Sequence, residues 1–230
     1  MPVWPPFQPA PPLDGVAALT GLPADAATAR RPILAVKIDN YALARPQWGL
    51  ELADAIIEVN VEGVTRFIAL FHSRIPPNVG PIRSARTVDL DLLTAMNRPV
   101  FAFSGANVGT TAWIDSAESS GVLFDFSSLV RPCYFRELSR PGPHNLLLGT
   151  GCALDLAEGG PASALWQFDD DWSPPANVPN AADTAFPVAM DGVQVDWTWD
   201  ATQGRYLRSQ DVQPHVTVTG DRLGFDNVVE

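Results

Sequence analysis

Short apolar runs bounded by turn residues recur along the first half of the chain. The run from Pro32 to Ile38 predicts a strand that ends at Asp39, and binding sites often gather at such strand ends in open α/β sheets. Two further runs, Ala55 to Val61 and Thr65 to His72, are separated by a glycine turn and predict a β-hairpin. The pattern indicates several strands of one sheet.

Helical periodicity follows a Gly-Pro turn at residues 80–81. Ser84 or Thr87 would cap the predicted helix. A strand at Pro99 to Phe103, a helix at Ala112 to Ala117 and a short strand at Gly121 to Phe126 come next. In the helix predicted after the Gly-Pro turn, apolar residues recur three and four positions apart, at Val88, Leu92, Leu93 and Met96.

The pattern changes after residues 157–183, which are rich in proline, glycine and aspartate. Beyond this stretch apolar and polar residues alternate, as at Val193, Val195 and Trp197, which predicts short antiparallel strands. The predicted fold is mixed α/β, with four parts. They are a proline-rich tether at 1–18, an N-terminal mixed-sheet α/β domain at 19–160, a linker at 161–184 and a smaller antiparallel β domain at 185–230. We expect the last part to be incomplete, because it is short for an independent core.

Composition narrows the class of protein. Hydrophobic residues make up 46% and charged residues 18% of the 230 positions, which is typical of a globular protein. The net charge of −11 argues against generic binding to nucleic acid or to an acidic membrane surface. Lys37 is the only lysine, so an anion site must be built from arginines, which favour bidentate contacts to phosphate or carboxylate. No apolar run is long enough to span a membrane, and no signal peptide precedes the tether.

Metal, redox and nucleotide signals are weak. Cys133 and Cys152 permit one disulfide without requiring it, and no cysteine or histidine spacing indicates zinc. The glycine-containing loop at 104–111 follows a strand but lacks the ending of a P-loop, and an ordinary strand–helix turn is the preferred interpretation. We therefore expect no cofactor. His144 as a general base would need an orienting carboxylate that the sequence does not identify.

Arginine beside turn residues is the main chemical signal. Arg83 and Arg86 lie three apart near the first turn of the predicted helix, where the macrodipole disfavours a cation unless an anion is bound. We expect them to share one anion site with five more residues: Arg45, Arg66, Arg136, His144 and Asn145. The alternative is internal ion pairing, and for Arg66 a pair with Glu58 or Glu62 across the hairpin is preferred.

The order of several motifs resembles a known family. The motifs are Ile38-Asp39-Asn40, ARPQWGL at 44–50, GVTRF at 63–67, GPIRSAR at 80–86 and Pro143-His144-Asn145. This series resembles the YerB-like bacterial lipoproteins, which have an N-terminal and a C-terminal domain of unknown function. The resemblance covers residues 19–230. It implies an extracytoplasmic protein of the cell envelope, tethered to the membrane by a lipidated cysteine that this chain lacks, and members usually continue further.

Three functions remain open, and the sequence predicts neither the oligomeric state nor the identity of a ligand. The first is a binding module for an anionic envelope ligand that carries phosphate or pyrophosphate. The second follows from a distant similarity to the LytR-CpsA-Psr phosphotransferases, which hold a polyprenyl pyrophosphate with arginines and Mg²⁺-binding aspartates. That similarity would make Asp39 and Asp54 the metal ligands and Arg45, Arg83 and Arg86 the pyrophosphate clamp. The third is a protein-interaction scaffold that uses tryptophans, for which domain packing is the simpler explanation.

Overall fold

The computed structural model describes residues 4, 14–168 and 185–229. The predicted tether at 1–18 and the predicted linker at 161–184 therefore lie largely outside the described residues. Three consecutive aspartates of the predicted linker, at 169–171, and Trp172, one of the tryptophans considered for a scaffold, lie outside them as well.

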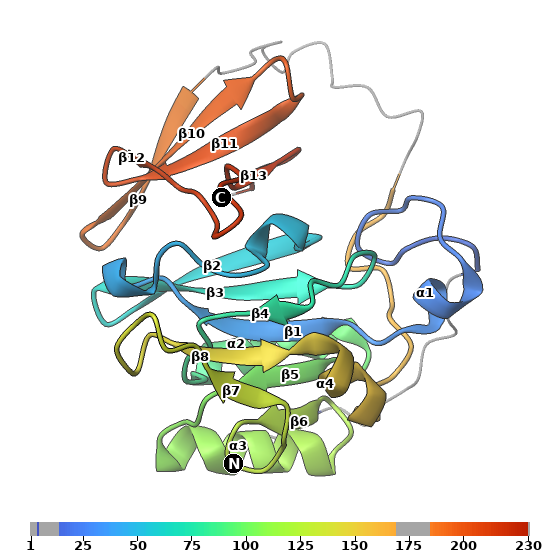
Figure 1. Ribbon diagram of the computed structural model, residues 1–230. Helices are drawn as coiled ribbons and strands as arrows, with labels where there is room; N and C mark the ends of the chain where they lie inside the picture. The colour runs from blue at the N-terminus through green and yellow to red at the C-terminus, as the bar shows by residue number, and fades with distance from the viewer. Residues whose placement is uncertain (1–3, 5–13, 169–184, 230) are drawn as a thin grey trace.

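Five strands form the central sheet of the N-terminal domain, in the order β2-β3-β1-β5-β6 (Figure 1). The strands β1, β5 and β6 are parallel, whereas β3 is antiparallel to both β1 and β2. The mixed α/β fold and the β2–β3 hairpin predicted from the sequence are thus confirmed. The five strands are β1 (Leu34–Asp39), β2 (Ala55–Val61), β3 (Val64–Phe71), β5 (Val100–Phe103) and β6 (Phe124–Ser127).

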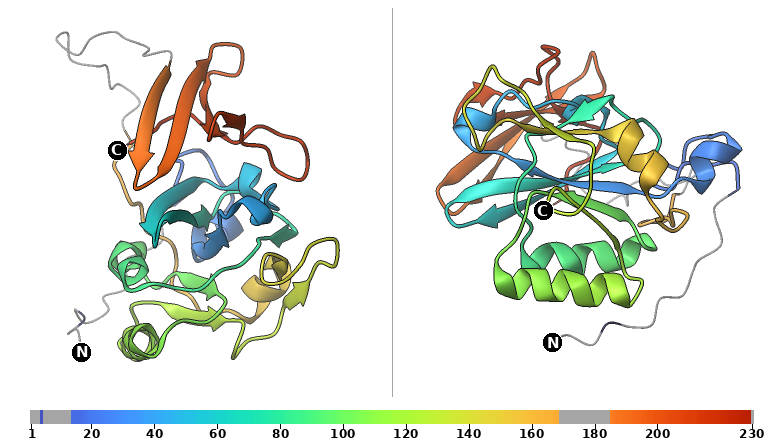
Figure 2. Two further views of the ribbon diagram at one scale, coloured as in Figure 1. Left: turned by 90° about the vertical axis from the view of Figure 1, so that its left-hand side faces the viewer. Right: turned by 60° about the horizontal axis from the view of Figure 1, so that its bottom comes forward.

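Helices α2 (Thr87–Leu93) and α3 (Val108–Ser119) cover one face of this sheet (Figure 2). The other face packs against α4 (Thr150–Leu156) and a small sheet in the order β4-β8-β7, which the sequence pattern did not predict. None of the helices in the described part of the chain is long and apolar enough to cross a membrane. The remaining elements are α1 (Ala26–Arg30), β4 (Asn78–Val79), β7 (Tyr134–Arg136), β8 (Leu146–Gly149) and 3-10 turns at Ala42–Ala44, Leu50–Leu52 and Thr94–Met96.

The pleat of β1 divides the core into two layers. Ile33 and Ala35 point toward α2 and α3, whereas Leu34, Val36 and Ile38 point toward β8 and α4. All six residues of β1 are buried, which is expected for a strand at the centre of a sheet covered on both faces. Burial on both sides means that any polar side chain near the end of β1 must find a partner within the protein.

Helix α2 begins differently from the prediction. Ser84 and Thr87 do not cap it; Arg86 is the capping residue, and its side chain accepts no hydrogen bond because a guanidinium only donates. The carboxylate of Asp89 accepts the backbone N–H of Arg86 instead, at 2.8 Å. The start of α2 is therefore held by an acidic side chain from its own first turn.

Cys133 and Cys152 form a disulfide with a Cα–Cα distance of 5.7 Å. It links the residue before β7 to α4 across a sequence separation of 19 residues. Disulfides persist in oxidising compartments, such as the extracellular space and the bacterial periplasm.

The C-terminal domain is a small antiparallel sheet in the order β12-β11-β10-β9, with β13 paired to β11. This confirms the predicted antiparallel β domain. Its core contains Val193, Val195 and Trp197, and the Trp197 ring packs edge-on against Phe225 with centroids 6.5 Å apart. The strands are β9 (Ala185–Met190), β10 (Val193–Asp200), β11 (Arg205–Gln210), β12 (Gln213–Pro214) and β13 (Gly224–Phe225).

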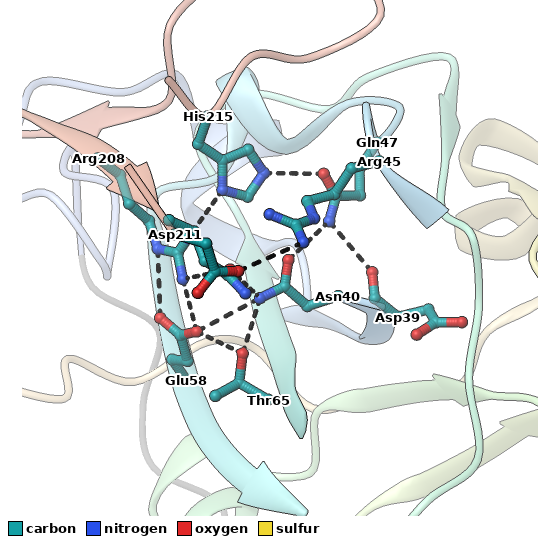
Figure 3. A network of polar contacts seen from close by, with 10 residues as sticks. Asp39, Asn40, Arg45, Gln47, Glu58, Thr65, Arg208, Asp211 and His215 are labelled. Atoms are coloured by element: carbon teal, nitrogen blue, oxygen red, sulfur yellow. Dashed lines mark hydrogen bonds and ion pairs between the residues drawn. The ribbon is translucent and has the colours of Figure 1, made fainter. Parts of the chain in front are cut away.

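A buried polar network joins the two domains (Figure 3). Arg208 of β11 is 1% exposed and donates from Nη2 to Oε1 of Glu58 at 2.7 Å and from Nε to Oε2 at 3.3 Å. Its guanidinium also lies over the ring of Phe67, 5.3 Å from the centroid. Asn40 donates to Thr65 at 2.7 Å and to Gln210 at 2.8 Å, so it bridges the same two domains. Each of these buried polar groups therefore has a partner.

His215 occupies the centre of this network in its neutral form. Its Nδ1 lies 2.6 Å from Nη1 of Arg208, and because a guanidinium only donates, Nδ1 must accept. Its Nε2–H then donates to Oε1 of Gln47 at 2.8 Å. Burial, reinforced by the charge of Arg208, holds the pKa of His215 well below its ordinary value of 6.5.

We predict that the free energy of unfolding falls as the pH is lowered through 6.5. His215 stays neutral in the folded protein, whereas in the unfolded chain it binds a proton below that pH, so acid favours unfolding. His72 adds to this effect, because its Nδ1 accepts the N–H of Ala18 and burial lowers its pKa. His215 should cost about 1.4 kcal/mol of stability one pH unit below its unfolded pKa, and His72 should add a smaller amount of the same sign.

Urea unfolding between neutral pH and pH about 5.5 measures this dependence. The variants His215→Gln and His72→Gln should each reduce the loss, His215→Gln by more, since glutamine does not titrate. An unfolding free energy that stays constant across this range in the unmodified protein would contradict the assignment of neutral histidines.

Candidate functional site

The carboxylate of Asp39, at the end of β1, holds three separate segments together. It is buried, and its Oδ1 accepts the backbone N–H of Tyr41 at 3.0 Å. Its Oδ2 accepts from Nδ1 of His144 at 2.8 Å and lies 3.4 Å from Nε of Arg83. One buried carboxylate thus positions an imidazole and a guanidinium next to each other.

His144 lies in the loop before β8, after the cis Gly142–Pro143 bond. Asp39 provides the orienting carboxylate that the sequence did not identify, and because a carboxylate accepts, Nδ1 of His144 donates in this contact. The ring of Tyr41 stacks on the imidazole, with centroids 5.2 Å apart and planes 17° apart. Within the described part of the chain, Nε2 of His144 has no hydrogen-bond partner, so it can act toward a ligand.

Arg66 lies opposite Asp39 in the β1–β3 register and is 6% exposed. Its Nη1 donates to the carbonyl of Ser84 at 3.2 Å, and its buried Nε has no hydrogen-bond partner among the described residues. The prediction that Arg66 forms an ion pair with Glu58 or Glu62 is wrong. Glu58 binds Arg208 across the domain interface, and Glu62 lies 3.5 Å from Arg86.

Arg66, Arg83 and Arg86 form a cluster of positive charge. Burial lowers the pKa of Arg66, and the charges of Arg86 and Arg83 lower it further. The nearby carboxylates are those of Asp39, which His144 shares, and of Glu62, whose side chain is 76% exposed. Because the carboxylate of Glu62 is largely in water, it offsets the charge of the neighbouring arginines only weakly. The cluster therefore keeps an excess of positive charge.

Lys37 and Asp89 form a buried ion pair beneath this cluster. Their side chains are fully buried, with Nζ 2.6 Å from Oδ1. Burial lowers the pKa of Lys37, and Asp89 opposes that shift. Because Asp89 already pairs with Lys37 and accepts the N–H of Arg86, it does not neutralise the arginine side chains.

Three of the predicted site residues serve other contacts. Arg45 lies 3.9 Å from Asp211 at the domain interface, where its charge contributes to the lowered pKa of His215. Arg136 donates to Oδ1 of Asn145 at 2.7 Å. Asn145 in turn donates to the carbonyl of Arg140 at 2.9 Å, which shapes the loop that carries His144.

Asp39 and Asp54 lie at opposite ends of the sheet. Leu70 of β3 pairs with both Ala35 and Ala55, so Asp54 is level with the start of β1 and Asp39 with its end. Asp54 accepts the backbone N–H groups of His72 and Ser73 at 2.6 and 2.7 Å. The described residues contain no group of three His, Cys, Asp or Glu side chains that could hold a metal ion. The structure therefore does not bring the two aspartates to a common metal.

Tyr41 and Arg140 were missed by sequence reasoning. Tyr41 is adjacent to the Asp39-Asn40 strand end, but nothing in the sequence indicates its stacking on His144. Arg140 donates to the carbonyls of Ala44 and Pro46, both at 2.7 Å, and so joins the loop before His144 to the loop after Asp39. These contacts connect segments nearly a hundred residues apart, beyond the reach of local patterns.

Two family models match most of the chain. The first is described as "Protein of unknown function (DUF3048) N-terminal domain" and matches residues 19–160. The second is the corresponding C-terminal domain and matches residues 185–230. Their descriptions name no ligand and no reaction.

Two comparisons with Bacillus subtilis proteins agree with these matches. The chain is 40% identical over 134 residues to "Putative lipoprotein YerB", an alignment that covers 56% of this chain and 38% of that protein. It also superposes on the crystal structure of the YerB protein with a TM-score of 0.73 and 26% identity, over 91% of this chain and 71% of the other. The alignment thus spans less than half the length of the curated relative. Together with the shared fold, the family matches show that this chain belongs to the DUF3048 family of YerB-like proteins.

Proposed function

We propose that the N-terminal domain binds an anionic ligand of the cell envelope, one that carries phosphate or pyrophosphate, through Arg83, Arg66 and Arg86. The observation that carries the proposal is the arrangement of Arg83. Its Nε lies against Asp39, and its two amino groups make no hydrogen bond to a described residue, while the side chain is 27% exposed. A guanidinium held in this way presents two N–H donors to a phosphate.

The electrostatics of the cluster support an anion as the ligand. Two arginines lie close enough to lower the pKa of a third, buried arginine, in a chain whose net charge is −11. Burying and crowding like charges costs free energy, which a bound anion would recover. His144 adds a further polar group beside Arg83, because both side chains contact the same oxygen of Asp39.

Two observations favour a ligand outside the cytoplasm. The Cys133–Cys152 disulfide is typical of oxidising compartments. The B. subtilis relative is named as a lipoprotein, which suggests an envelope location for this chain as well. Ligands of that compartment include phosphate-bearing lipids and glycans.

We predict that Arg83→Ala abolishes the rise in melting temperature that pyrophosphate or phosphate produces in the unmodified protein. Ligand binding to the folded state stabilises it by mass action, so the shift disappears with the site. The melting temperature without ligand should change by only a few degrees, since Arg83 makes one partly exposed ion pair. Arg83→Lys should keep part of the shift, because it keeps the charge but not the two-pronged donor.

Arg74→Ala is the matched control for this experiment. Arg74 is exposed and follows β3 at the opposite end of the sheet, so its loss should leave the anion response unchanged. Equal responses of the Arg83 and Arg74 variants would contradict the proposed site.

We predict that Arg66→Met weakens anion binding without weakening the fold. Methionine has a similar length, and the change removes a buried charge that two neighbouring arginines repel. The free energy of unfolding should rise or stay within about 1 kcal/mol of the original value, as in other replacements of buried charges by apolar residues. Urea unfolding and pyrophosphate titration measure the two effects separately. A large loss of stability would instead mark Arg66 as a structural residue.

A second candidate function, hydrolysis of a phosphate ester or anhydride, is favoured by the Asp39–His144 pair. Nε2 of His144 would take a proton from water as the water oxygen bonds to phosphorus. The bond from phosphorus to the leaving oxygen would break, and that oxygen would receive the proton. The arginines would stabilise the charge that develops on the phosphoryl oxygens.

Turnover of p-nitrophenyl phosphate and pyrophosphate, with and without Mg²⁺, tests this second candidate. His144→Gln should reduce turnover about a hundredfold or more, the usual contribution of a positioned base. It should leave the pyrophosphate-induced melting shift largely intact. An inactive unmodified protein, or equal turnover in the variant, would remove hydrolysis and leave binding as the function.

A further inference from the structure

Exposed apolar side chains lie at the same edge of the sheet as the arginine cluster. They come from three loops and from the first residue of α3, at the edge of the sheet where β1, β5 and β6 end, which is the edge seen in the left view of Figure 2. Val108, Leu129 and Leu138 are 89%, 78% and 87% exposed. Tyr41, Leu43 and Val130 are exposed at the same edge. We call these six residues the apolar rim.

One side of the apolar rim is linked to the segment of Arg83 and Arg86 through Ser104 and Gly105. Ser104 donates its backbone N–H to the carbonyl of Arg83 at 2.9 Å, and the carbonyl of Gly105 accepts from Ala85 at 2.9 Å. A side-chain carbon built on Gly105 would lie 3.8 Å from Cδ1 of Leu129. Leu129 therefore lies next to the segment that carries the cluster.

The other side of the apolar rim borders His144. Tyr41 stacks on the imidazole, and Leu43 follows it in the same loop. Leu138 belongs to the loop that ends at His144, and Arg140 fastens this loop to the carbonyls of Ala44 and Pro46. Positive charge at the centre and apolar side chains on both sides thus share one edge of the molecule.

We propose that this edge binds the phosphate of a membrane amphiphile, with the phosphate on Arg83 and its neighbours and the hydrocarbon chain on the apolar rim. The inference rests on the proposed function and specifies the ligand class for the same site. Apolar loop tips in water cost free energy unless something covers them, and patches of this kind mark interaction sites. An amphiphile with an anionic head matches both the charge and the apolar surface.

Other occupants fit this surface less well. A second copy of the chain packed symmetrically by this edge would bring two arginine clusters face to face. Uniform adsorption to an acidic bilayer is opposed by the net charge of −11. A single lipid, engaged through its phosphate, avoids both costs.

A series of n-alkyl phosphates below their critical micelle concentrations tests the proposal, with inorganic phosphate as the reference. Affinity, measured by calorimetry, should rise about twofold for each added methylene. Full burial of a methylene would raise the affinity about fourfold, and on an open rim each methylene is buried by about half. The double variant Leu129→Ser/Leu138→Ser should flatten this rise and leave the affinity for inorganic phosphate unchanged. Both substituted residues are exposed, so the fold should not suffer.

Leu22→Ser is the matched control. Leu22 is 64% exposed and belongs to the segment that contacts His72, at the other end of the sheet. It should leave the chain-length dependence intact. Arg83→Ala should abolish binding of the whole series of alkyl phosphates.

Flotation of the protein with phosphatidylcholine vesicles should require added phosphatidic acid. Equal binding to vesicles without phosphatidic acid would overturn the role of the phosphate.

The outcomes separate the two proposals. Inorganic phosphate that binds through Arg83 with no gain from the alkyl chain would overturn the amphiphile and leave the anion site standing. A chain-length dependence that survives in the Leu129/Leu138 variant would place the chain elsewhere and overturn the role of the apolar rim. No binding of any phosphate would overturn the proposed function and this inference together.

Discussion

The pleat at the end of β1 sends two neighbouring polar side chains to opposite faces of a buried sheet. Asp39 points to the face that α2 and α3 cover, and Asn40 to the face that meets the C-terminal domain. Strand geometry imposes this division, since successive side chains alternate between faces. Both side chains are almost fully buried, so each needs polar partners from other segments. The arginine site and the domain interface both follow from that requirement.

The two faces satisfy the requirement differently. On the Asn40 side, the central donors and acceptors are paired with one another: Arg208 meets Glu58, and His215 accepts from Arg208 while donating to Gln47. On the Asp39 side, one carboxylate serves both His144 and Arg83, while Arg66 makes one hydrogen bond to the part of the chain that the structure describes. A balanced buried network stabilises and fixes a domain arrangement. An unbalanced one leaves capacity for a ligand, and functional sites are where such local costs are tolerated.

The family relationship explains the fold without explaining the activity. This chain shares its architecture with the YerB protein of B. subtilis at 26% identity, and neither family description names a ligand. Function must therefore be argued from the site. The amino groups of Arg83, which make no hydrogen bond to a described residue, lie at one edge of the sheet together with the buried charge of Arg66 and the apolar rim. The proposal of an amphiphilic anion rests on these features and not on fold similarity.

Much of the fold could be predicted from local patterns. The apolar runs indicated β1, the β2–β3 hairpin, β5 and β6, because strands buried on both faces are nearly continuous in hydrophobicity. The alternation after residue 190 indicated the antiparallel C-terminal sheet. The small sheet of β4, β7 and β8 was missed, because strands of two to four residues are too short to show a period.

By itself, the sequence determined the α/β class, the arginine-only chemistry of any anion site and the presence of Arg83, Arg86 and His144 in loops beside turns. Only the tertiary structure decided which residues meet. It joined His144 and Arg83 to Asp39, gave Glu58 to Arg208 rather than to Arg66, and separated Asp54 from Asp39. The physical reason is one of range. Periodicity and turn chemistry act over a few residues, whereas ion pairs such as Arg208–Glu58, 150 residues apart, depend on how the whole chain packs.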